Sequence, residues 1–385
     1  MLRALAASDD RRLREAATRT LLTSTTIRAQ REVLGSLRAA VPGTAPGRKF
    51  RSIHDAHNKA LSQFELPGEL EREEGKPASG DDATDQAYDG LGNTYDMYEQ
   101  VFARNSIDDR GMRLVATVHF GNAFNNAFWN GQQMVFGDGD GTIFTGFTKS
   151  LDVIGHELTH GVTEHTASLA YHNQSGALNE SMSDVFGSLV KQYTRKQDAE
   201  SADWLIGADI LAAGVQGEAL RSMKAPGTAY DDARLGGKDP QPKHMRDFEE
   251  LPDDEWNDWG GVHIYSGIPN HAFYLAATKI AGNAWEAAGS IWYSALLQLW
   301  PTAEFQDCAN VTIEVAGTLY GHGSSQQQAV QSAWDEVGVR MVPVRAKVRR
   351  VGRDGGVAVE RNGARLRRQL ETLSSELRKT IDALA

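Results

Sequence analysis

The sequence predicts an α+β protein in which a β-rich first lobe is followed by an α-helical second lobe. Segments with strand-like alternation lie between about residues 50 and 140, whereas the pattern from about 176 to 340 is mainly helical. A length of 385 residues suits two or three domains, and an apolar content of 41% is enough for large cores. The single cysteine, Cys308, cannot form an intramolecular disulfide, which excludes a disulfide scaffold.

The chain begins with a predicted helical leader. Apolar residues recur at helical spacing over residues 1–40, which predicts one or two amphipathic helices. Arginines interrupt each apolar run there, so no secretory signal peptide is visible. The segment VPGTAPG at 41–47 then breaks the pattern with two prolines and two glycines, as expected of a linker.

The predicted β-rich lobe starts at FRSIHDAHN (50–58), which begins with the alternation of a strand. The next segment, LPGELEREEGKPASGDD (66–82), is polar and is predicted to consist of turns. A helix is predicted from about Thr84, with an aromatic and apolar stripe that packs in the core. The later elements are a strand at 113–120, an irregular edge with a second strand and tight turn at 125–141, and a buried helix at 151–165.

The net charge of −11 conceals an acidic body between two basic ends. Residues 1–50 hold 10 Lys/Arg and 4 Asp/Glu, and residues 343–385 hold 11 and 5, so each end carries +6. The remaining 19 basic and 42 acidic residues give residues 51–342 a charge of −23. This pattern argues against nucleic-acid binding, and no apolar run is long enough to span a membrane. The basic ends either dock on the acidic body or are two solvated tails.

The helix predicted at 151–165 carries the motif His156-Glu157-Leu158-Thr159-His160. Residues at i and i+4 lie on one face of a helix, so both imidazoles can reach one metal ion. Catalytic zinc takes three protein ligands, and Glu180, twenty residues after His160, supplies a carboxylate on the next predicted helix. Glu157 is placed to act as general base. Two surface histidines on an amphipathic helix are the alternative.

Two further polar residues accompany this predicted zinc site. Asn179 and Asp184 flank Glu180 in the segment GALNESMSD, and Asp184 lies at i+4 from Glu180. Both are predicted to accept the free ring N–H groups of the histidines and so orient them. The alternative for Asp184 is an ordinary exposed helix carboxylate.

These segments resemble the thermolysin family of zinc metallopeptidases. The resemblance rests on HELTH, on GALNESMSD, on NNAFWNGQQMVFGDGDG before them and on GGVHIYSGIPNHAFY after them, and it covers about residues 52–340. The short helical leader without a signal peptide is similar to the protealysin branch. The implied fold is a thermolysin-like two-lobe metallopeptidase, with the HELTH helix at the floor of the cleft. The implied divisions are a propeptide-like leader, a β-rich lobe ending in the active-site helix, a helical lobe and a basic tail of unknown role: 1–50, 51–165, 166–342 and 343–385.

The resemblance also implies roles for other residues. His263 and Tyr171 would stabilise the developing oxyanion, and Asp258 would orient and charge the His263 imidazole. The implied substrate-binding residues are the strand edge at Asn126, Ala127 and Trp129, Arg221 for a substrate carbonyl, and Leu220 and Val153 in the primed-side pocket. The implied activity is a neutral endopeptidase that cuts before bulky hydrophobic residues, with zinc-activated water and Glu157 as general base.

The chain departs from the family at its double calcium site. Asp152 is retained, but Lys191, Leu205 and Ala208 stand where acidic ligands are expected. An ammonium group can pair with Asp152 but cannot coordinate calcium, so we expect this site to be lost. The GDGDG turn at 137–141 remains a weaker candidate for Ca²⁺. Tyr265 stands where many relatives have asparagine, and no function is assigned to it.

The expected partners are protein or peptide substrates and the chain's own leader, 1–50, as an intramolecular ligand, with no nucleic acid and no membrane. The resemblance implies secretion, while the absence of a visible signal leaves cytoplasmic retention or non-classical export open. Three rival functions are weighed against the peptidase: a catalytically dead relative that binds, another zinc hydrolase, and a structural metal site. The last two do not require Glu157, His263 and Tyr171 together.

Overall fold

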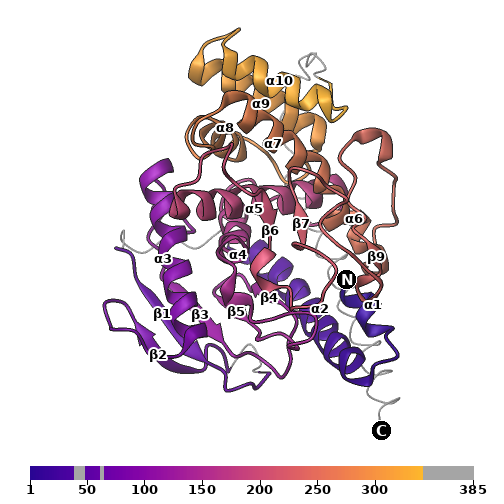
Figure 1. Cartoon of the computed structure of the whole chain (residues 1–385). Coiled ribbons are helices and arrows are strands. Elements are labelled where there is room, and N and C mark those ends of the chain that lie inside the picture. Colours follow the sequence, from indigo (N-terminus) through magenta and orange to yellow (C-terminus); the bar gives the residue numbers. More distant parts are fainter. Residues whose placement is uncertain (39–47, 61–64, 341–385) are drawn as a thin grey trace, which may run out of the picture. The chain divides into compact units, whose positions relative to one another are not determined.

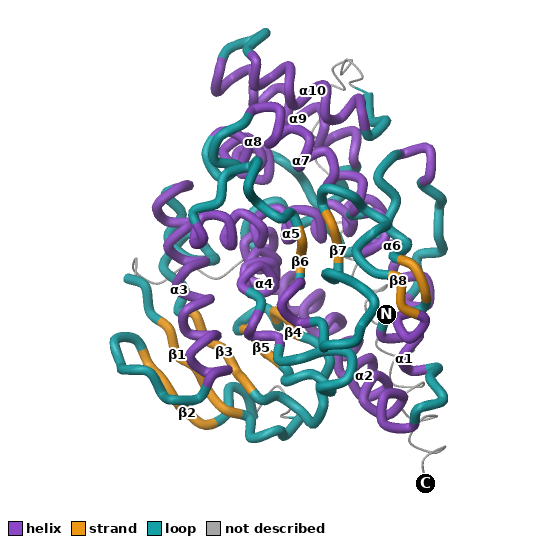
Figure 2. The backbone as a smooth tube through the Cα atoms, viewed as in Figure 1, coloured by secondary structure: helices purple, strands orange, loops and turns teal. Residues whose placement is uncertain are grey.

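The computed structural model describes residues 1–38, 48–60 and 65–340, with only the helical backbone over 25–38. The linker expected at 41–47 and the basic tail at 343–385 lie outside the described residues. The described body contains a β-sheet layer with helices packed on it and a larger group of helices beyond it (Figure 2). The expected β-rich first lobe and helical second lobe are therefore confirmed.

A five-stranded mixed sheet in the order β2-β1-β3-β5-β4 forms the first lobe. Its strands are β1 (Arg51–Asp55), β2 (Glu69–Glu73), β3 (Leu114–Val118), β4 (Ala127–Trp129) and β5 (Met134–Phe136). β1, β3 and β5 run parallel, whereas β2 and β4 pair antiparallel with their single neighbours. β4 is therefore an edge strand, whose outer backbone groups have no partner strand in the described sheet.

The sequence prediction was wrong for β2, since 66–82 was expected to consist of turns. None of its five residues is buried, so the strand has no apolar face that could produce an alternating pattern. Its backbone pairing with β1 forms it instead. An outer strand with two solvated faces leaves no hydrophobic signal in the sequence.

Helix α3 (Asp82–Phe102) packs against β1 and β3 and carries the predicted aromatic stripe. The Asp81 side chain accepts a hydrogen bond from the Thr84 amide and so caps the helix. The stripe is in the core as expected, with four members buried and Phe102 partly buried: Tyr88, Leu91, Tyr95, Tyr98 and Phe102.

Helices α4 (Leu151–Glu164) and α5 (Asn173–Arg195) form the centre of the molecule (Figure 1). They pack closely because glycines face each other, and a Cβ on Gly187 would lie 2.4 Å from the Asp152 carbonyl oxygen. This close approach lets side chains from the two helices meet in one buried layer. It explains how residues at 156–160 and 180–184 come to share a site.

The second lobe is completed by further helices and short paired strands. The helices are α6 (Asp258–Tyr265), α7 (Gly267–Ile280), α8 (Ala287–Leu296), α9 (Phe305–Tyr320) and α10 (Ser325–Glu336). The short strands are β6 (Leu205–Ile206) with β7 (Arg221–Ser222), and β8 (Asp231–Asp232) with β9 (Gly237–Lys238). Among the described residues, no helix is both long and apolar enough to cross a membrane.

The leader forms helices α1 (Leu2–Ala6) and α2 (Arg11–Arg38), and its first turns pack on the body (Figure 1). Its buried side chains are apolar or carry a hydroxyl: Leu5, Leu13, Ala16, Ala17, Thr20 and Ser24. Four of its arginines are exposed: Arg11, Arg12, Arg14 and Arg19. Burial of apolar surface therefore contributes to this contact, and these four arginines lie at the exposed face of α2.

Candidate metal and catalytic centre

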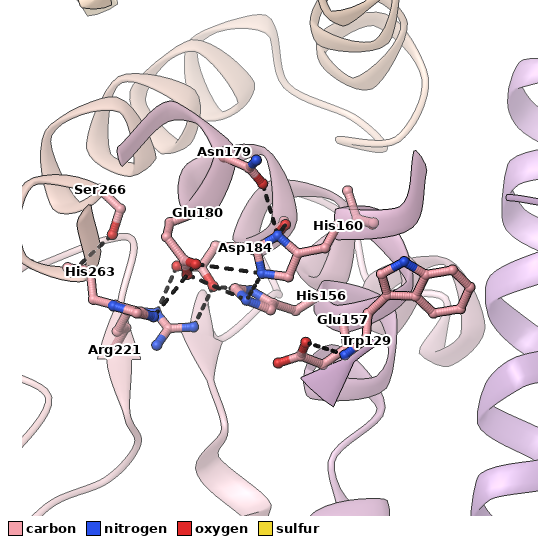
Figure 3. Close-up of polar contacts among 12 residues, drawn as sticks. Trp129, His156, Glu157, His160, Asn179, Glu180, Asp184, Arg221, His263 and Ser266 are labelled. Carbon is pink, nitrogen blue, oxygen red and sulfur yellow. Dashed lines mark hydrogen bonds and ion pairs between the residues drawn. The ribbon is translucent and has the colours of Figure 1, made fainter. Parts of the chain in front are cut away.

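Helices α4 and α5 bring His156, His160 and Glu180 together in a buried cluster (Figure 3). The Nε2 atoms of the two histidines are 3.1 Å apart, and each is 3.5 Å from an oxygen of the Glu180 carboxylate. The i, i+4 spacing on α4 places both rings on the face that packs against α5. The three residues predicted as zinc ligands therefore meet.

The second ring nitrogen of each histidine is already engaged. His156 Nδ1 bonds the Asp184 carboxylate at 2.8 Å, and His160 Nδ1 lies 2.8 Å from Asn179 Oδ1 and 3.1 Å from Ser183 Oγ. Because Nδ1 serves as donor in both rings, each Nε2 carries a lone pair directed at the other.

The Glu180 carboxylate faces the same point as the two Nε2 atoms. Its Oε2 atom is buried without a hydrogen-bond partner among the described residues, and its Oε1 is contacted by the Tyr171 hydroxyl. Cationic side chains around it, His263 first, outweigh the opposing effect of burial and hold the Glu180 pKa well below its usual range. Two imidazole nitrogens and a charged carboxylate facing one point fit a tetrahedral zinc ion with an open fourth position.

Asp184 holds the α5 side of the site in place. The Arg221 guanidinium donates to both carboxylate oxygens through Nε at 2.7 Å and Nη2 at 2.6 Å, and Asn270 Nδ2 adds a third bond at 2.8 Å. Burial alone would raise the Asp184 pKa, but Arg221 and His156 outweigh it and lower that pKa. Asp184 is thus a buried, charged acceptor for the His156 ring.

Glu157 projects from α4 on the side of the edge strand β4 (Figure 3). Its Oε2 accepts a hydrogen bond from the Trp129 backbone amide at 3.2 Å. The Trp129 indole donates to Glu164, about two turns further along α4, at 3.3 Å. A carboxylate beside the histidines is therefore held against the strand edge where a peptide could bind.

His263, Tyr171 and Asp258 meet on the opposite side of the metal cluster. Asp258 accepts from the His263 amide at 2.8 Å and from its ring Nδ1 at 2.7 Å, and His263 Nε2 is 3.2 Å from the Tyr171 hydroxyl. The same Nε2 is 3.5 Å from Glu180 Oε1, so these groups border the metal cluster.

The backbone before His263 has an unusual shape. Four consecutive residues, Asp258 to Gly261, have φ values between 53° and 80°, in the left-handed region. At Gly260 a Cβ would lie 2.1 Å from Asn173 Oδ1, so this position requires glycine for space as well as conformation. This turn lets the Asp258 carboxylate bind both the amide and the ring of His263.

The substrate-binding residues expected from the resemblance lie partly in contact with the leader. The Asn125 amide donates to Thr20 Oγ1 at 3.1 Å, and Asn126 Nδ2 donates to Ser24 Oγ at 3.0 Å. Ala127 is buried in β4, Val153 is buried in the first turn of α4, and Leu220 is partly buried. The leader therefore reaches the predicted substrate edge.

Three polar residues of the centre are absent from the sequence prediction. Asn270 and Ser183 both lie within segments that carried the resemblance, and the spacing of Ser183 from Glu180 places it one helical turn away. Gln241 donates to the His263 carbonyl oxygen at 2.7 Å, across 22 residues of sequence. No local pattern indicates such a distant contact, so Gln241 was not identifiable.

A second buried charged pair, Asp152 and Lys191, lies further along the same two helices, with the exposed Asp203 beside it. Lys191 Nζ is 2.7 Å from Asp152, 2.9 Å from Asp203 and 2.7 Å from the Leu205 carbonyl oxygen. Burial lowers the Lys191 pKa, but the two carboxylates outweigh it and raise that pKa. The expected ammonium–Asp152 ion pair is therefore present.

The acidic residues of the GDGDG turn are engaged by protein groups. Asp138 binds His119 at 2.9 Å and Asn58 at 2.9 Å. Asp140 accepts hydrogen bonds from the amides of Thr142 and Ile143. These contacts stabilise the turn.

Comparison with known proteins places the chain in one family. The model of the thermolysin metallopeptidase catalytic domain matches residues 44–164, and that of the thermolysin metallopeptidase alpha-helical domain matches residues 167–339. The chain is 54% identical to an "Extracellular metalloprotease" of Pectobacterium carotovorum subsp. carotovorum over 77% of this chain and 82% of that protein. It is 53% identical to "Protease PrtS" of Photorhabdus sp. (strain Az29), over 76% of each.

A solved structure shows the same relationship. The precursor of protealysin, a metalloproteinase from Serratia proteamaculans, superimposes with a TM-score of 0.78 at 49% identity. The match covers 88% of this chain and 97% of that one. The similarity therefore includes a precursor form, not only the two peptidase lobes.

Proposed function

This chain belongs to the thermolysin family of zinc metallopeptidases and is a metalloendopeptidase made as a precursor, and we propose how its residues perform that activity. The observation that carries the proposal is the convergence of His156, His160 and Glu180 beside Glu157. We propose these four as the zinc ligands and the general base. Zinc, when bound there, would polarise a substrate carbonyl group and acidify water.

Glu157 then performs the proton transfers. It takes a proton from the attacking water and returns it to the nitrogen of the leaving amine. Its bond to the Trp129 amide supports this role, because that bond holds the carboxylate beside the edge strand. The substrate lies along β4 as an added strand, paired with backbone groups of residues 126–129.

His263 and Tyr171 stabilise the negative charge that develops on the carbonyl oxygen. Both can donate a hydrogen bond, and 3.2 Å separates His263 Nε2 from the Tyr171 hydroxyl. Asp258 is a positioning residue, because it accepts from Nδ1, favours the positively charged ring and directs the Nε2–H donor toward the reacting group. Asn179 and Asp184 position the two ligand histidines in the same way.

The proposed specificity is for bulky hydrophobic residues after the cut. Val153 and Leu220 line the primed-side pocket in this proposal, and both pack in or against the core. Arg221 turns Nε and Nη2 toward Asp184, so Nη1 is the nitrogen we expect a substrate carbonyl to meet.

We propose that residues 1–50 are an inhibitory propeptide, removed by a cut near 41–51. The hydrogen bonds from Asn125 and Asn126 to Thr20 and Ser24 support this, since they use the edge on which a substrate would bind. The proposed divisions after it are a β-rich lobe, a helical lobe and a tail of unassigned role: 51–165, 166–342 and 343–385. The relatives include a protein named as extracellular, and we propose that this enzyme also acts outside the cell.

We further propose that the family's double calcium site is lost. Lys191 places an ammonium group between Asp152 and Asp203, and Leu205 and Ala208 contribute no carboxylate. A bound cation there would face the lysine charge at close range.

The decisive experiment compares the zinc-loaded chain with its Glu157→Gln variant, each after removal of residues 1–50. Both are incubated with denatured casein, and the cuts are mapped by mass spectrometry. We expect wild-type cuts before Leu, Phe or Ile, and a loss of turnover of about 10²–10⁴-fold in the variant. Zinc content should be equal in both proteins. Equal turnover would refute Glu157 as the base, and cuts without an apolar preference would refute the proposed pocket.

A further inference from the structure

A ten-residue acidic segment lies directly before the oxyanion-stabilising histidine. Residues 249–258, EELPDDEWND, contain six carboxylates and no lysine or arginine. We call this stretch the acidic segment. It includes Trp256, whose side chain is 83% exposed, the highest value among the exposed large hydrophobic residues described. An exposed indole among carboxylates is suited to bind a cation.

The acidic segment is anchored to the catalytic lobe at its first residues. The Phe248 and Tyr265 rings are 4.5 Å apart, and the Tyr265 hydroxyl accepts the Glu249 amide at 3.2 Å. This contact also accounts for Tyr265, to which the sequence assigned no function. The ring fixes the position at which the acidic segment leaves the core.

The rest of the segment is tied to the catalytic side chains. Asp253 bonds the His172 ring at 2.6 Å, next to Tyr171 in sequence. The Trp259 amide donates to the Asp254 carbonyl oxygen at 2.8 Å, and Asp258 binds His263. Trp256 is two residues from Asp258, so their Cα atoms are at most about 7 Å apart. The backbone at Trp256 is therefore close to Asp258, the residue that binds His263.

In the precursor, an arginine of the leader already lies over this indole. The Arg3 guanidinium lies 5.3 Å from the centre of the Trp256 ring, and its Nη1 donates to the Trp256 carbonyl oxygen. A guanidinium over an indole is a favourable cation–π arrangement, and the surrounding carboxylates add attraction for a positive charge. The contact with Arg3 thus shows that this surface can bind a guanidinium group.

We propose that Trp256 and the acidic segment bind a basic side chain of the peptide substrate once the leader has gone. In this role Trp256 is a specificity-determining residue, and Arg3 occupies its site in the precursor. The inference rests on the proposed peptidase function and adds a preference that the hydrophobic pocket does not supply. Arginine suits the site better than lysine, because its planar group both stacks on the ring and donates in plane.

The test uses matched peptides that differ in one side chain. Each peptide has Leu as the first residue after the cut. One of the other positions within three residues of the cut carries either arginine or its neutral isostere citrulline. We measure kcat/KM for the zinc-loaded chain after processing of its leader. At one or more positions we expect kcat/KM to be about two- to fivefold higher for the arginine peptide than for the citrulline peptide. That preference should fall as salt is raised.

The Trp256→Ala variant should lose most of the preference for the arginine peptide over the citrulline peptide. Tyr320→Ala, which removes another exposed aromatic ring at the end of α9, is the matched control and should keep the preference. A wild-type ratio of one at every position, or a preference that survives Trp256→Ala, overturns the inference. Failure of the peptidase proposal looks different, because then neither peptide is cut.

A second measurement examines the same surface without turnover. In the full-length Glu157→Gln chain, Arg3→Gln and Trp256→Ala should each speed trypsin cleavage at the arginines of the leader about two- to fivefold. Trypsin should cleave the double variant no faster than either single variant, because the two substitutions remove the same contact. Additive effects would show that Arg3 does not bind Trp256.

Discussion

Helices α4 and α5 place buried acidic side chains in two clusters, and the counter-charge differs between them. At Glu180 and Asp184, partners within the chain occupy Asp184 and the Nδ1 atoms of the two histidines, while both Nε2 atoms face Glu180. At Asp152, by contrast, the chain supplies its own cation in Lys191. Both clusters are almost fully buried, so burial alone does not distinguish them.

The difference shows what makes a buried acidic cluster a binding site. Charged groups in a core require a counter-charge, and either an external ion or a side chain can supply it. In the first cluster the two Nε2 atoms and the Glu180 carboxylate converge on one point, where a metal ion would supply the counter-charge. In the second, the Lys191 ammonium group supplies the counter-charge to Asp152. The following predictions test this contrast, from the largest expected effect to the smallest.

Lys191→Met should destabilise the fold by about 3–5 kcal/mol, because it leaves the Asp152 carboxylate buried without its counter-charge. Urea unfolding in the presence of a calcium chelator measures the change. The double variant Lys191→Met/Asp152→Asn removes both charges and should recover part of the loss. A single variant as stable as the wild type would mean that the two clusters do not differ as we argue.

Asp184→Asn should lower zinc affinity about 10–100-fold while the chain remains folded, because the neutral amide polarises the His156 ring less. Zinc affinity is measured by competition with a chelating dye. Asp152→Asn is the matched change at the other cluster and should leave zinc affinity unaltered. If both variants lose zinc affinity equally, the clusters are coupled and the contrast fails.

His119 provides a third case, in which the internal cation is titratable. It bonds Asp138 at 2.9 Å and lies 3.3 Å from Asp81, and these bonds, Asp138 first, raise its pKa to about 9. The pKa of His119 in the unfolded chain is about 6.5. The stabilising contribution of His119 is therefore complete below that pH and is lost as pH rises through about 9.

The free energy of unfolding of wild type and His119→Gln should therefore differ most near about pH 6 and converge above about pH 9.5. Urea unfolding across that range measures the difference. The contribution of Lys191 should persist over the same range, since its pKa is raised from an already higher value. A difference between wild type and His119→Gln that does not change with pH would show that His119 acts only through packing.

Much of the centre could be predicted because its chemistry is local in sequence. The spacing of His156 and His160 places both rings on one helix face whatever surrounds them, and Glu180 and Asp184 repeat that spacing on α5. The aromatic stripe of α3 could be predicted for the same reason, because its spacing follows the helix period. Strand β2 was not, because an outer polar strand exists only through its pairing with β1.

What the sequence by itself determined is therefore which side chains share a face, the location of the motif and the charge of each part. Only the tertiary structure decided which groups meet across the chain. The pairing of Asp184 with Asn270 spans 86 residues, and that of Ser24 with Asn126 spans 102. The physical reason is that helix periodicity is a property of neighbouring residues, whereas the partner of a buried charge is set by how the elements pack.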